Sequence, residues 1–315
     1  MTDRRDGTID TTQRGYRAIT GATGRRMVDV ARERGMRVEL VFTSFGRERN
    51  EAFFGNLERQ DAAIAGLVEL VGELGLDGVN VDVESMPVSL VEAYGAFVAR
   101  LKAAVEAADP ADRVTVATQA NLTGAAAAAA AARAGAERIF LMGYDYRINA
   151  SWPGAVAPLD RRDGEERDLE WSLDAYAAVG VPADRILLGL PLYGRSWPVT
   201  DAELGAPPTG RGDEWFPERN VELLTDPAVV PVRDEIEVVE LYVVDGDGTF
   251  VPPATAPPMV VPPGSPGATG AAPTPMPPRD DLRAIYVDSP ATLERKLGLV
   301  DERGLAGGGF WAIGY

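Results

Sequence analysis

The chain contains 315 residues, and its 48 Asp and Glu side chains against 31 Lys and Arg side chains give a formal net charge of −17. This acidic balance disfavours nucleic acid and anionic membrane surfaces as partners, because both bind clusters of Lys and Arg. The sequence has no Cys and no His, which excludes disulfides, thiolate and imidazole metal sites and the Ser-His-Asp triad. Proton transfer must then use Asp, Glu, Tyr, Lys or water, and a Ca²⁺ or Mg²⁺ site would need carboxylates.

The N-terminal residues and the apolar stretches predict neither an export signal nor a membrane span in this sequence. Residues 1–7 are charged and lack the apolar core of a secretory signal. No apolar run approaches membrane-spanning length. The length fits one or two domains, or a single α/β barrel, with a large buried core.

Strand-like and helix-like segments alternate through most of the chain. In chain order we expect a helix with Met27, Val30 and Ala31 on one face, a strand at 38–45, a helix at 58–74 ended by Gly75, a strand at 77–84, a helix at 88–107, a strand at 114–118, a helix over the alanine run 125–132, a strand at 138–144, a helix at 172–179, a strand at 186–190, a helix that begins at Ser289-Pro290 and a strand at 310–313. Repeated βα units predict a parallel sheet with helices outside it.

The stretch from Arg195 to about Asp281 interrupts this alternation. Residues 236–244 and 249–251 flank Asp-Gly-Asp-Gly at 245–248, which predicts a β-hairpin, and 285–287 can add a third strand. Residues 252–278 are rich in Pro, Ala and Gly and predict a loop. We therefore expect an insertion after the penultimate βα unit.

The strand at 77–84 carries the strongest functional signal. Successive residues of a strand point to opposite faces, so Asn80, Asp82 and Glu84 project together, opposite three valines. An edge strand with a solvated face would show the same alternation. Two carboxylates on one apolar strand instead favour a catalytic strand in a protein without histidine.

Three further strand ends carry aromatic and charged side chains. They are Met142, Tyr144 and Asp145 at the end of one strand, Tyr193 and Arg195 after another, and Trp311 in the last. Trp152 and Trp197 follow such strands and are candidates for outer aromatic platforms. In a (β/α)₈ barrel these positions lie at the C-terminal face, where active sites are built. Aromatic faces and carboxylates together suit a sugar ring, which offers both C–H faces and hydroxyl groups.

The same residues give the chain a specific resemblance. It resembles the family 18 glycoside hydrolases, the chitinase-like (β/α)₈ or TIM barrels, and among them the bacterial spore and cell-wall hydrolases. The matching motifs, in chain order, are Asp-Gly-x-Asp-x-Asp-x-Glu at Asp77, Gly78, Asp82 and Glu84, Met-x-Tyr-Asp at Met142, Tyr144 and Asp145, Gly-x-Pro-x-Tyr-Gly-Arg at 189–195, and the tryptophan of the last strand at Trp311.

The resemblance implies substrate-assisted retaining hydrolysis of β-1,4-linked N-acetylglucosamine polymers, either chitin or peptidoglycan, without a metal or another cofactor. By that analogy Glu84 is the general acid and then the base, and Asp82 orients the substrate's N-acetyl group. Tyr144 would bind that group and Asp145 the distorted sugar, with Trp311 as the floor. The remaining substrate-binding candidates are Asn80, Met142, Tyr193 and Arg195. Repulsion from Asp82 is expected to raise the pKa of Glu84.

The sequence also departs from the family pattern. Asn80 stands where most chitinases have Asp, Val83 replaces the usual aromatic residue, and 43–46 only loosely matches an expected Ser-x-Gly-Gly. The strand at 38 aligns with the third of the family, so we expect an incomplete barrel that lacks the first two strands, as a truncated gene model or a fragment would. The expected segments are 1–195 with strands three to seven, 196–281 as the insertion, and 282–315 with the last helix and strand.

Several alternatives stay open at this point. The chain could be a non-hydrolytic, glycan-binding relative or an inactive barrel fragment, and a divalent-metal site would need ligands beyond Asp82, Glu84 and Asp145. Individual candidates also have structural interpretations: a turn at 77–78, a cap on the barrel rim for Tyr193 and Arg195, and core packing for Met142 or Trp311. The resemblance implies an extracellular or cell-envelope location.

Overall fold

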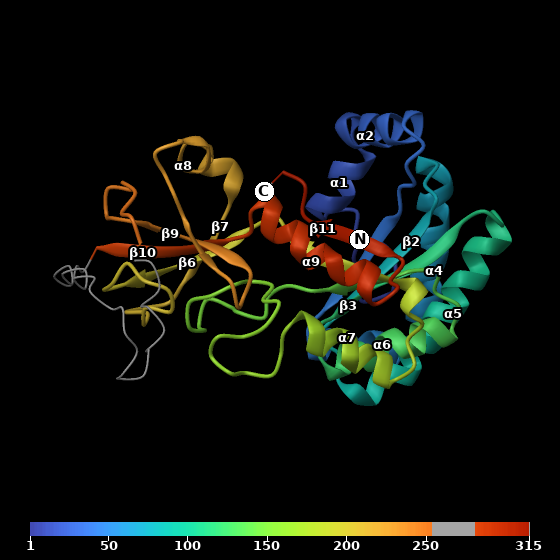
Figure 1. Cartoon of the computed structure of the whole chain (residues 1–315). Coiled ribbons are helices and arrows are strands. Elements are labelled where there is room, and N and C mark those ends of the chain that lie inside the picture. Colours follow the sequence, from blue (N-terminus) through green and yellow to red (C-terminus); the bar gives the residue numbers. More distant parts are fainter. Residues whose placement is uncertain (254–280, 315) are drawn as a thin grey trace, which may run out of the picture. The chain divides into compact units, whose positions relative to one another are not determined.

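The computed structural model describes residues 1–253 and 281–314 and divides the chain into two compact units (Figure 1). Unit 1 comprises Met1–Met142, Ser172–Leu188 and Val300–Gly309. Unit 2 comprises Gly143–Trp171, Gly189–Leu299 and Phe310–Tyr315. The chain therefore passes between the two units several times, and each unit is described by itself.

A six-stranded sheet with the order β1-β2-β3-β4-β5-β11 forms the framework of unit 1. Its strands are β1 (Leu40–Phe45), β2 (Gly78–Glu84), β3 (Arg113–Gln119), β4 (Ile139–Met142), β5 (Ile186–Pro191) and β11 (Gly307–Trp311). β1, β2, β3 and β4 pair in parallel, and β5 and β11 begin in unit 1 and end in unit 2. These are the six strands that the sequence predicted, in the order of barrel strands three to eight.

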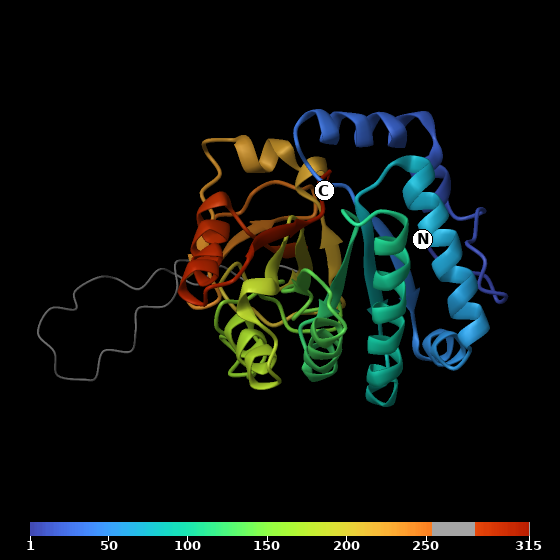
Figure 2. The ribbon, with the colours of Figure 1, turned by 90° about the vertical axis from the view of Figure 1, so that its right-hand side faces the viewer.

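Helices precede the first strand of this sheet and connect its successive strands. They are α1 (Arg14–Thr20), α2 (Ala22–Glu33), α3 (Arg47–Phe54), α4 (Leu57–Leu74), α5 (Val91–Ala108) after the 3₁₀ turn η1 (Val88–Leu90), α6 (Leu122–Arg133), and α7 (Leu169–Ala178), which precedes the 3₁₀ turn η2 (Ala183–Arg185). Figure 2 shows the cyan-to-green row of α4, α5 and α6 beside the strands, and α4–α5 and α5–α6 are in contact. The sequence interpretation missed α1 and α3.

The core of unit 1 lies between this row of helices and one face of the sheet. Alternate strand residues such as Phe42, Val81 and Val116 are fully buried there. The ring of Phe97 on α5 lies 5.7 Å from that of Phe42 and 5.2 Å from that of Phe53, measured between centroids. The burial of one strand face against helices follows the period-two pattern of the sequence.

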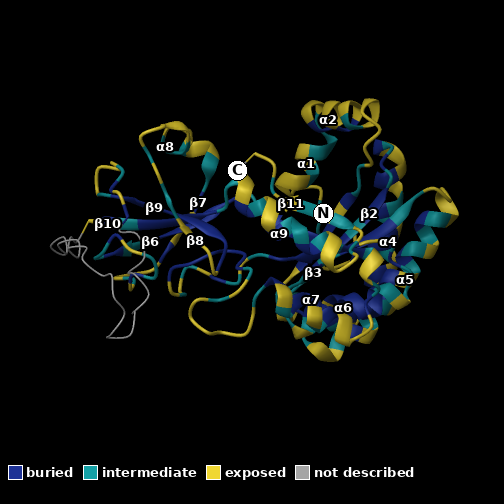
Figure 3. Ribbon diagram, viewed as in Figure 1, coloured by how far each residue is buried: buried dark blue, intermediate teal, exposed yellow. Residues whose placement is uncertain are grey.

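The predicted helix with Met27, Val30 and Ala31 on one face is α2, and this apolar face is largely exposed. On α2, Met27 and Val30 are 68% and 38% exposed, whereas Val28 is buried. Figure 3 shows α2 coloured mostly as exposed. Helical spacing places Met27, Val30 and Ala31 on a common face. The pattern does not say which face other elements cover, and the buried residues of α2 are Gly24 and Val28.

Helix ends in unit 1 follow local capping chemistry. The side chain of Asn56 accepts a hydrogen bond from the backbone N–H of Arg59 at 2.9 Å and caps α4. Gly75 ends the same helix with φ +58°, a left-handed conformation that glycine adopts without a steric penalty, as its position in the sequence predicted. Asn121 caps α6 in the same way through Gly124.

Unit 2 contains a five-stranded antiparallel sheet with the order β7-β6-β10-β9-β8. Its strands are β6 (Gly194–Val199), β7 (Asp213–Trp215), β8 (Val232–Asp234), β9 (Val239–Val244) and β10 (Leu282–Val287), and the unit also holds η3 (Pro217–Arg219), α8 (Val221–Thr225) and most of α9 (Pro290–Glu302). The predicted turn at 245–248 is present, with a bridge between Val244 and Phe250. The three predicted segment boundaries stay a prediction.

A buried charge network holds the loop after β4 within unit 2. The guanidinium of Arg147, 2% exposed, pairs with the carboxylate of Glu237, and it also donates to Asp163 at 2.8 Å. Glu237 also accepts a hydrogen bond from the backbone N–H of Ala155 at 2.7 Å. Gly154 is required beside this pair, because a Cβ there would lie 2.2 Å from Nε of Arg147.

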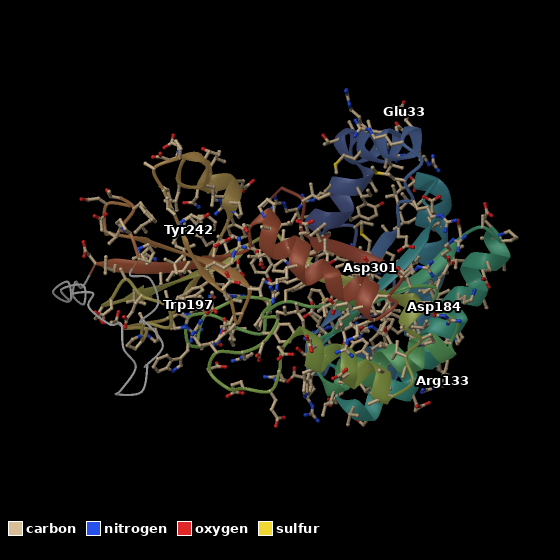
Figure 4. The ribbon with its side chains drawn as sticks, in the orientation of Figure 1. Glu33, Arg133, Asp184, Trp197, Tyr242 and Asp301 are labelled. Atoms are coloured by element: carbon tan, nitrogen blue, oxygen red, sulfur yellow. The ribbon has the colours of Figure 1, made fainter. Side chains whose placement is uncertain are left out.

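Trp197 lies in the sheet of unit 2 and is fully buried with Tyr286 in a core cluster (Figure 4). Its interpretation as an outer aromatic platform was therefore wrong, since a buried indole offers no face to a ligand. The predicted helix start at Ser289-Pro290 is confirmed: the Ser289 hydroxyl accepts from Thr292 N–H at 3.3 Å. Apart from 252 and 253, the predicted loop at 252–278 lies outside the described residues.

The described helices include none with the length and apolar character needed to cross a membrane.

We expect Phe97→Ala to lower the free energy of unfolding by about 3–5 kcal/mol, because it empties the centre of a close-packed aromatic cluster. Urea unfolding followed by circular dichroism measures the change. Leu57→Ala, which truncates a side chain that is 65% exposed, is the control and should cost no more than about 0.5 kcal/mol. Equal losses in both variants would contradict this description of the core.

Candidate active site

Asn80, Asp82 and Glu84 project from one face of β2, as the sequence predicted. All three are half-buried, whereas the intervening valines Val79, Val81 and Val83 are at most 8% exposed. The parallel register places Asp82 between Thr43 of β1 and Ala117 of β3. The two carboxylates therefore lie two residues apart on the face opposite the helices.

Asp82 has a strongly perturbed carboxyl group. Burial raises its pKa to about 7, repulsion from Glu84 adds to the rise, and the N-terminal ammonium opposes it. Among the described residues, its Oδ1 atom is buried without a hydrogen-bond partner. The sequence analysis expected a raised pKa for Glu84, and that expectation stays a prediction. The structure shows that burial raises the pKa of Asp82.

Glu84 is held by backbone and side-chain contacts at the C-terminal end of β2. Its carbonyl oxygen accepts hydrogen bonds from Nδ2 of Asn50 at 2.7 Å and from the N–H of Gly46 at 3.2 Å. Nε2 of Gln119, at the end of β3, lies 3.5 Å from its Oε2 atom. Asn50 and Gln119 were missed in the sequence. The one sequence signal for Gln119 is its place at the end of a predicted strand. Asn50 lies on a helix that was not predicted.

Asn80 takes part in a hydrogen-bond chain toward the N-terminal end of the sheet. Its Nδ2 atom donates to the Thr115 hydroxyl at 2.7 Å, and that hydroxyl donates to the carboxylate of Glu39. Burial raises the pKa of Glu39. Thr115 and Glu39 were also missed, because nothing in their sequence neighbourhoods distinguishes them from sheet residues.

The Asp77-Gly78 pair has a structural role, as the turn interpretation allowed. Oδ2 of Asp77 accepts a hydrogen bond from the backbone N–H of Val38 at 2.7 Å and so joins the approach to β1 with the start of β2. Gly78 has φ +137°, and a Cβ there would lie 2.0 Å from the carbonyl oxygen of Arg113. Only glycine fits this backbone.

A second group of predicted residues gathers within unit 2 around Asp145. The Tyr193 hydroxyl donates to Oδ1 of Asp145 at 2.6 Å, and Nη2 of Arg195 donates to the same oxygen at 2.8 Å. The rings of Tyr144 and Tyr193 meet edge to face, with centroids 6.3 Å apart. Burial and the neighbouring Asp145 carboxylate raise the pKa of Tyr193 well above its ordinary value.

The backbone and a further amide complete this group. β4 ends at Met142, so Asp145 follows in the loop, where it adopts φ +59°. Arg195 is 5% exposed and also donates to Oδ1 of Asn149, a partner that the sequence did not indicate. A residue in the left-handed region that is held by two donors is well fixed, which suits a carboxylate that must keep one orientation.

The remaining predicted residues differ in exposure. Trp311, at the end of β11, is 49% exposed, so core packing does not describe it. Met142 is 8% exposed, which favours its structural interpretation. Trp152 is 58% exposed and borders a cavity of about 240 Å³ within unit 2. Trp311 and Trp152 therefore offer indole faces that a ligand can reach.

No cluster of three or more Asp and Glu side chains with metal-binding geometry occurs in the described parts of the chain. Of the carboxylates named above, those of Asp77 and Asp145 accept hydrogen bonds from protein groups, and Asp145 also pairs with Arg195. What this arrangement can do chemically is transfer protons and accept hydrogen bonds from a neutral, hydroxyl-rich ligand.

Comparison with known families gives one assignment over most of the chain. The model of the glycosyl hydrolases family 18 matches residues 25–315. Chitotriosidase-1 of Mus musculus is 35% identical over 83 residues, which are 24% of this chain and 18% of that protein. The putative sporulation-specific glycosylase YdhD of Bacillus subtilis (strain 168) is 25% identical over 163 residues, 50% of this chain and 36% of that protein. The matched segments thus span less than half the length of either relative.

Solved structures show the same fold. The crystal structure of YdhD from Bacillus subtilis has a TM-score of 0.69 and 16% identity and covers 98% of this chain and 87% of its own. A mutant class V chitinase from Nicotiana tobaccum in complex with NAG4 has a TM-score of 0.73 and 16% identity, with coverage of 99% and 85%. At these identities the likeness concerns the fold.

We expect Asp82→Asn to stabilise the protein at pH 8 but not at pH 4. The folded-state pKa of Asp82, about 7, lies above its ordinary value of 3.8, so the folded protein binds the proton more tightly than the unfolded chain. Stability that depends on this proton is present below about pH 4 and is lost as pH rises toward 7. Asparagine removes the loss, which should be about 2–4 kcal/mol.

Thermal unfolding at several pH values between 4 and 8 measures this effect. Asp29→Asn, at an exposed position of α2, is the control and should change stability equally at all pH values. A pH-independent difference between the parent protein and Asp82→Asn would rule out the raised pKa.

Proposed function

Because this chain belongs to family 18 of the glycosyl hydrolases, we propose that it cleaves β-1,4 linkages in glycans that contain N-acetylglucosamine. The observation that carries the proposal is the pair of carboxylates two residues apart on one face of β2. One of them, Asp82, has a pKa raised to about 7. Most glycosidases use a pair of neighbouring acidic side chains.

The proposed mechanism uses the substrate's own acetamido group as nucleophile. Its carbonyl oxygen attacks the anomeric carbon while Glu84 gives a proton to the glycosidic oxygen, and the C–O bond to the leaving sugar breaks. Asp82 accepts a hydrogen bond from the acetamido N–H and balances the positive charge of the cyclic intermediate. Glu84, now ionised, takes a proton from water, which attacks the anomeric carbon from the face opposite the acetamido oxygen. The bond between that oxygen and the anomeric carbon breaks, so the acetamido group is regenerated and the original configuration is restored.

We propose that the group around Asp145 contacts the sugar. Tyr144 would hydrogen-bond the acetamido group, Asp145 would bind a hydroxyl of the distorted ring, and Trp311 would stack on its apolar face. Support comes from Tyr193 and Arg195, which both donate to Oδ1 of Asp145 and hold its carboxylate in place, and from the half-exposed indole of Trp311. A stacked aromatic floor beside a fixed carboxylate is a common sugar-binding arrangement.

Chitin and peptidoglycan are both candidate substrates. The named relatives include a chitinase bound to NAG4 and a putative sporulation-specific glycosylase, which support the two polymers respectively. Both polymers lie outside the cytoplasm, so we propose that the protein acts extracellularly or in the cell envelope. The acidic surface, with net charge −17, suits a neutral glycan better than a polyanion.

Glu84→Gln should lower kcat on a chromogenic N-acetylglucosamine oligomer by about 10²–10⁴-fold, because the amide cannot protonate the leaving oxygen. Release of the chromophore measures it. Glu92→Gln, at an exposed position of α5, is the matched control and should leave kcat unchanged. Equal turnover by parent and Glu84→Gln would refute the assigned acid, whereas tight binding without turnover in the parent would favour a glycan-binding protein.

Trp311→Ala should raise KM for the same oligomer by about 10–100-fold, since it removes the stacking surface proposed for the sugar. Trp311→Phe keeps an aromatic face and should recover most of the loss. An unchanged KM in the alanine variant would remove Trp311 from the binding site. Steady-state kinetics over a range of oligomer concentrations distinguish these results.

A further inference from the structure

Three polar side chains form a hydrogen-bond chain on the sheet face that carries Asp82 and Glu84, nearer the N-terminal ends of the strands. It links Glu39, just before β1, with Thr115 on β3 and Asn80 on β2. Glu39 must cross β2 to reach Thr115. The β2 residue before Val79 is Gly78, which has no side chain to block the path. The three residues are 35 to 76 positions apart in the sequence.

The hydrogen bonds of this chain have a fixed direction. A hydroxyl has one proton, and that of Thr115 donates to the Glu39 carboxylate. Thr115 can then only accept from Asn80, and it does so from Nδ2 at 2.7 Å. The amide of Asn80 is thereby held with its N–H₂ group toward β3, and its carbonyl oxygen points away from Thr115.

The strand neighbours of Asn80 on this face, other than Thr115, follow from the register. The register places Val41 beside it on β1, and Gly78 precedes it on the same face of β2. The next residue on that face is Asp82, whose Oδ1 atom is buried and has no hydrogen-bond partner in the described chain. An amide carbonyl that faces Asp82 can accept a hydrogen bond from its protonated form but repels the ionised form.

We propose that Glu39 and Thr115 are positioning residues that hold the Asn80 carbonyl toward Asp82 and thereby favour the protonated form of Asp82. The carboxylate of Glu39 fixes the hydroxyl, the hydroxyl fixes the amide, and the amide acts on Asp82. If Asn80 turned over, its N–H₂ group would instead stabilise ionised Asp82. The effect on Asp82 stands without the proposed function, whereas its consequence for hydrolysis rests on it.

Other charged groups also affect the pKa values of Glu39 and Asp82, so the test must take them into account. Glu39 faces Arg37, whose positive charge lowers its pKa, and Asp77, whose negative charge raises it. Asp82 faces Glu84 and the N-terminal ammonium, and its charge is also felt by the buried hydroxyl of Tyr94 on α5. A useful variant must therefore break the hydrogen-bond chain without changing any charge.

Thr115→Val meets that requirement, because valine has a similar shape and no hydroxyl. Titration of the ¹³C carboxyl signal of Asp82 by NMR, assigned with Asp82→Asn, should show its pKa fall by about one unit as the released amide turns its N–H₂ group to the carboxylate. Thr115→Ser restores the hydroxyl and should restore the pKa of the parent protein. Thermal unfolding of both variants shows whether the fold is intact.

Glu39→Gln tests the far end of the chain. It should also lower the pKa of Asp82, partly by removing a negative charge and partly by releasing Thr115. In the Thr115→Val background only the charge effect remains, so Glu39→Gln should then lower the pKa by less than it does alone. Equal shifts in both backgrounds, or an unchanged pKa in Thr115→Val, would overturn the proposal.

Kinetics separate this proposal from the proposed function. If the positioning role and the proposed function both hold, the part of the pH profile of kcat that reports the ionisation of Asp82 shifts in Thr115→Val together with the pKa measured by NMR. It returns to the parent position in Thr115→Ser. If the protein hydrolyses no N-acetylglucosamine oligomer but the NMR shift occurs, the positioning role stands and the proposed function fails. If the protein hydrolyses the oligomer but the pKa of Asp82 measured by NMR is unchanged in Thr115→Val, the proposed function stands and the positioning role fails.

Discussion

The alternation of side chains along β2 is the constraint on which the rest of this structure depends. Because consecutive strand residues point to opposite faces, burying Val79, Val81 and Val83 against helices forces Asn80, Asp82 and Glu84 onto the other face. A slip of one residue would bury both carboxylates among apolar side chains. Parallel pairing with β1 and β3 fixes this register, and Gly78 allows the close approach of Arg113 that begins it.

This placement carries an electrostatic cost that appears at Asp82. A half-buried carboxyl beside a second one resists ionisation, so part of the folding free energy is lost at neutral pH. Such local instability is common where chemistry needs a perturbed group. The surroundings of β2 offset it with well-formed contacts, among them the hydrogen bond from Asn50 to the Glu84 carbonyl and the aromatic cluster around Phe97.

In unit 2, charged side chains that lie in loops are held in place by hydrogen bonds and ion pairs. Asp145 has a left-handed backbone and receives donors from Tyr193 and Arg195, and Arg147 is buried against Glu237 in the same loop region. Buried ion pairs of this kind add little net stability, but breaking one leaves an uncompensated charge. They therefore hold the loop in one arrangement, which is what a binding surface built on irregular backbone requires.

The sequence by itself determined the strands of the six-stranded sheet, the polar face of β2 and the family motifs, because periodicity and capping are local properties. It did not determine which faces are covered: the apolar face of α2 is exposed and Trp197 is buried, since burial depends on what the rest of the chain brings alongside. Only the tertiary structure decided the hydrogen-bond partners of the site residues. Gln119 reaches Glu84 and Thr115 joins Asn80 to Glu39 because the register of parallel strands places residues from distant parts of the sequence side by side.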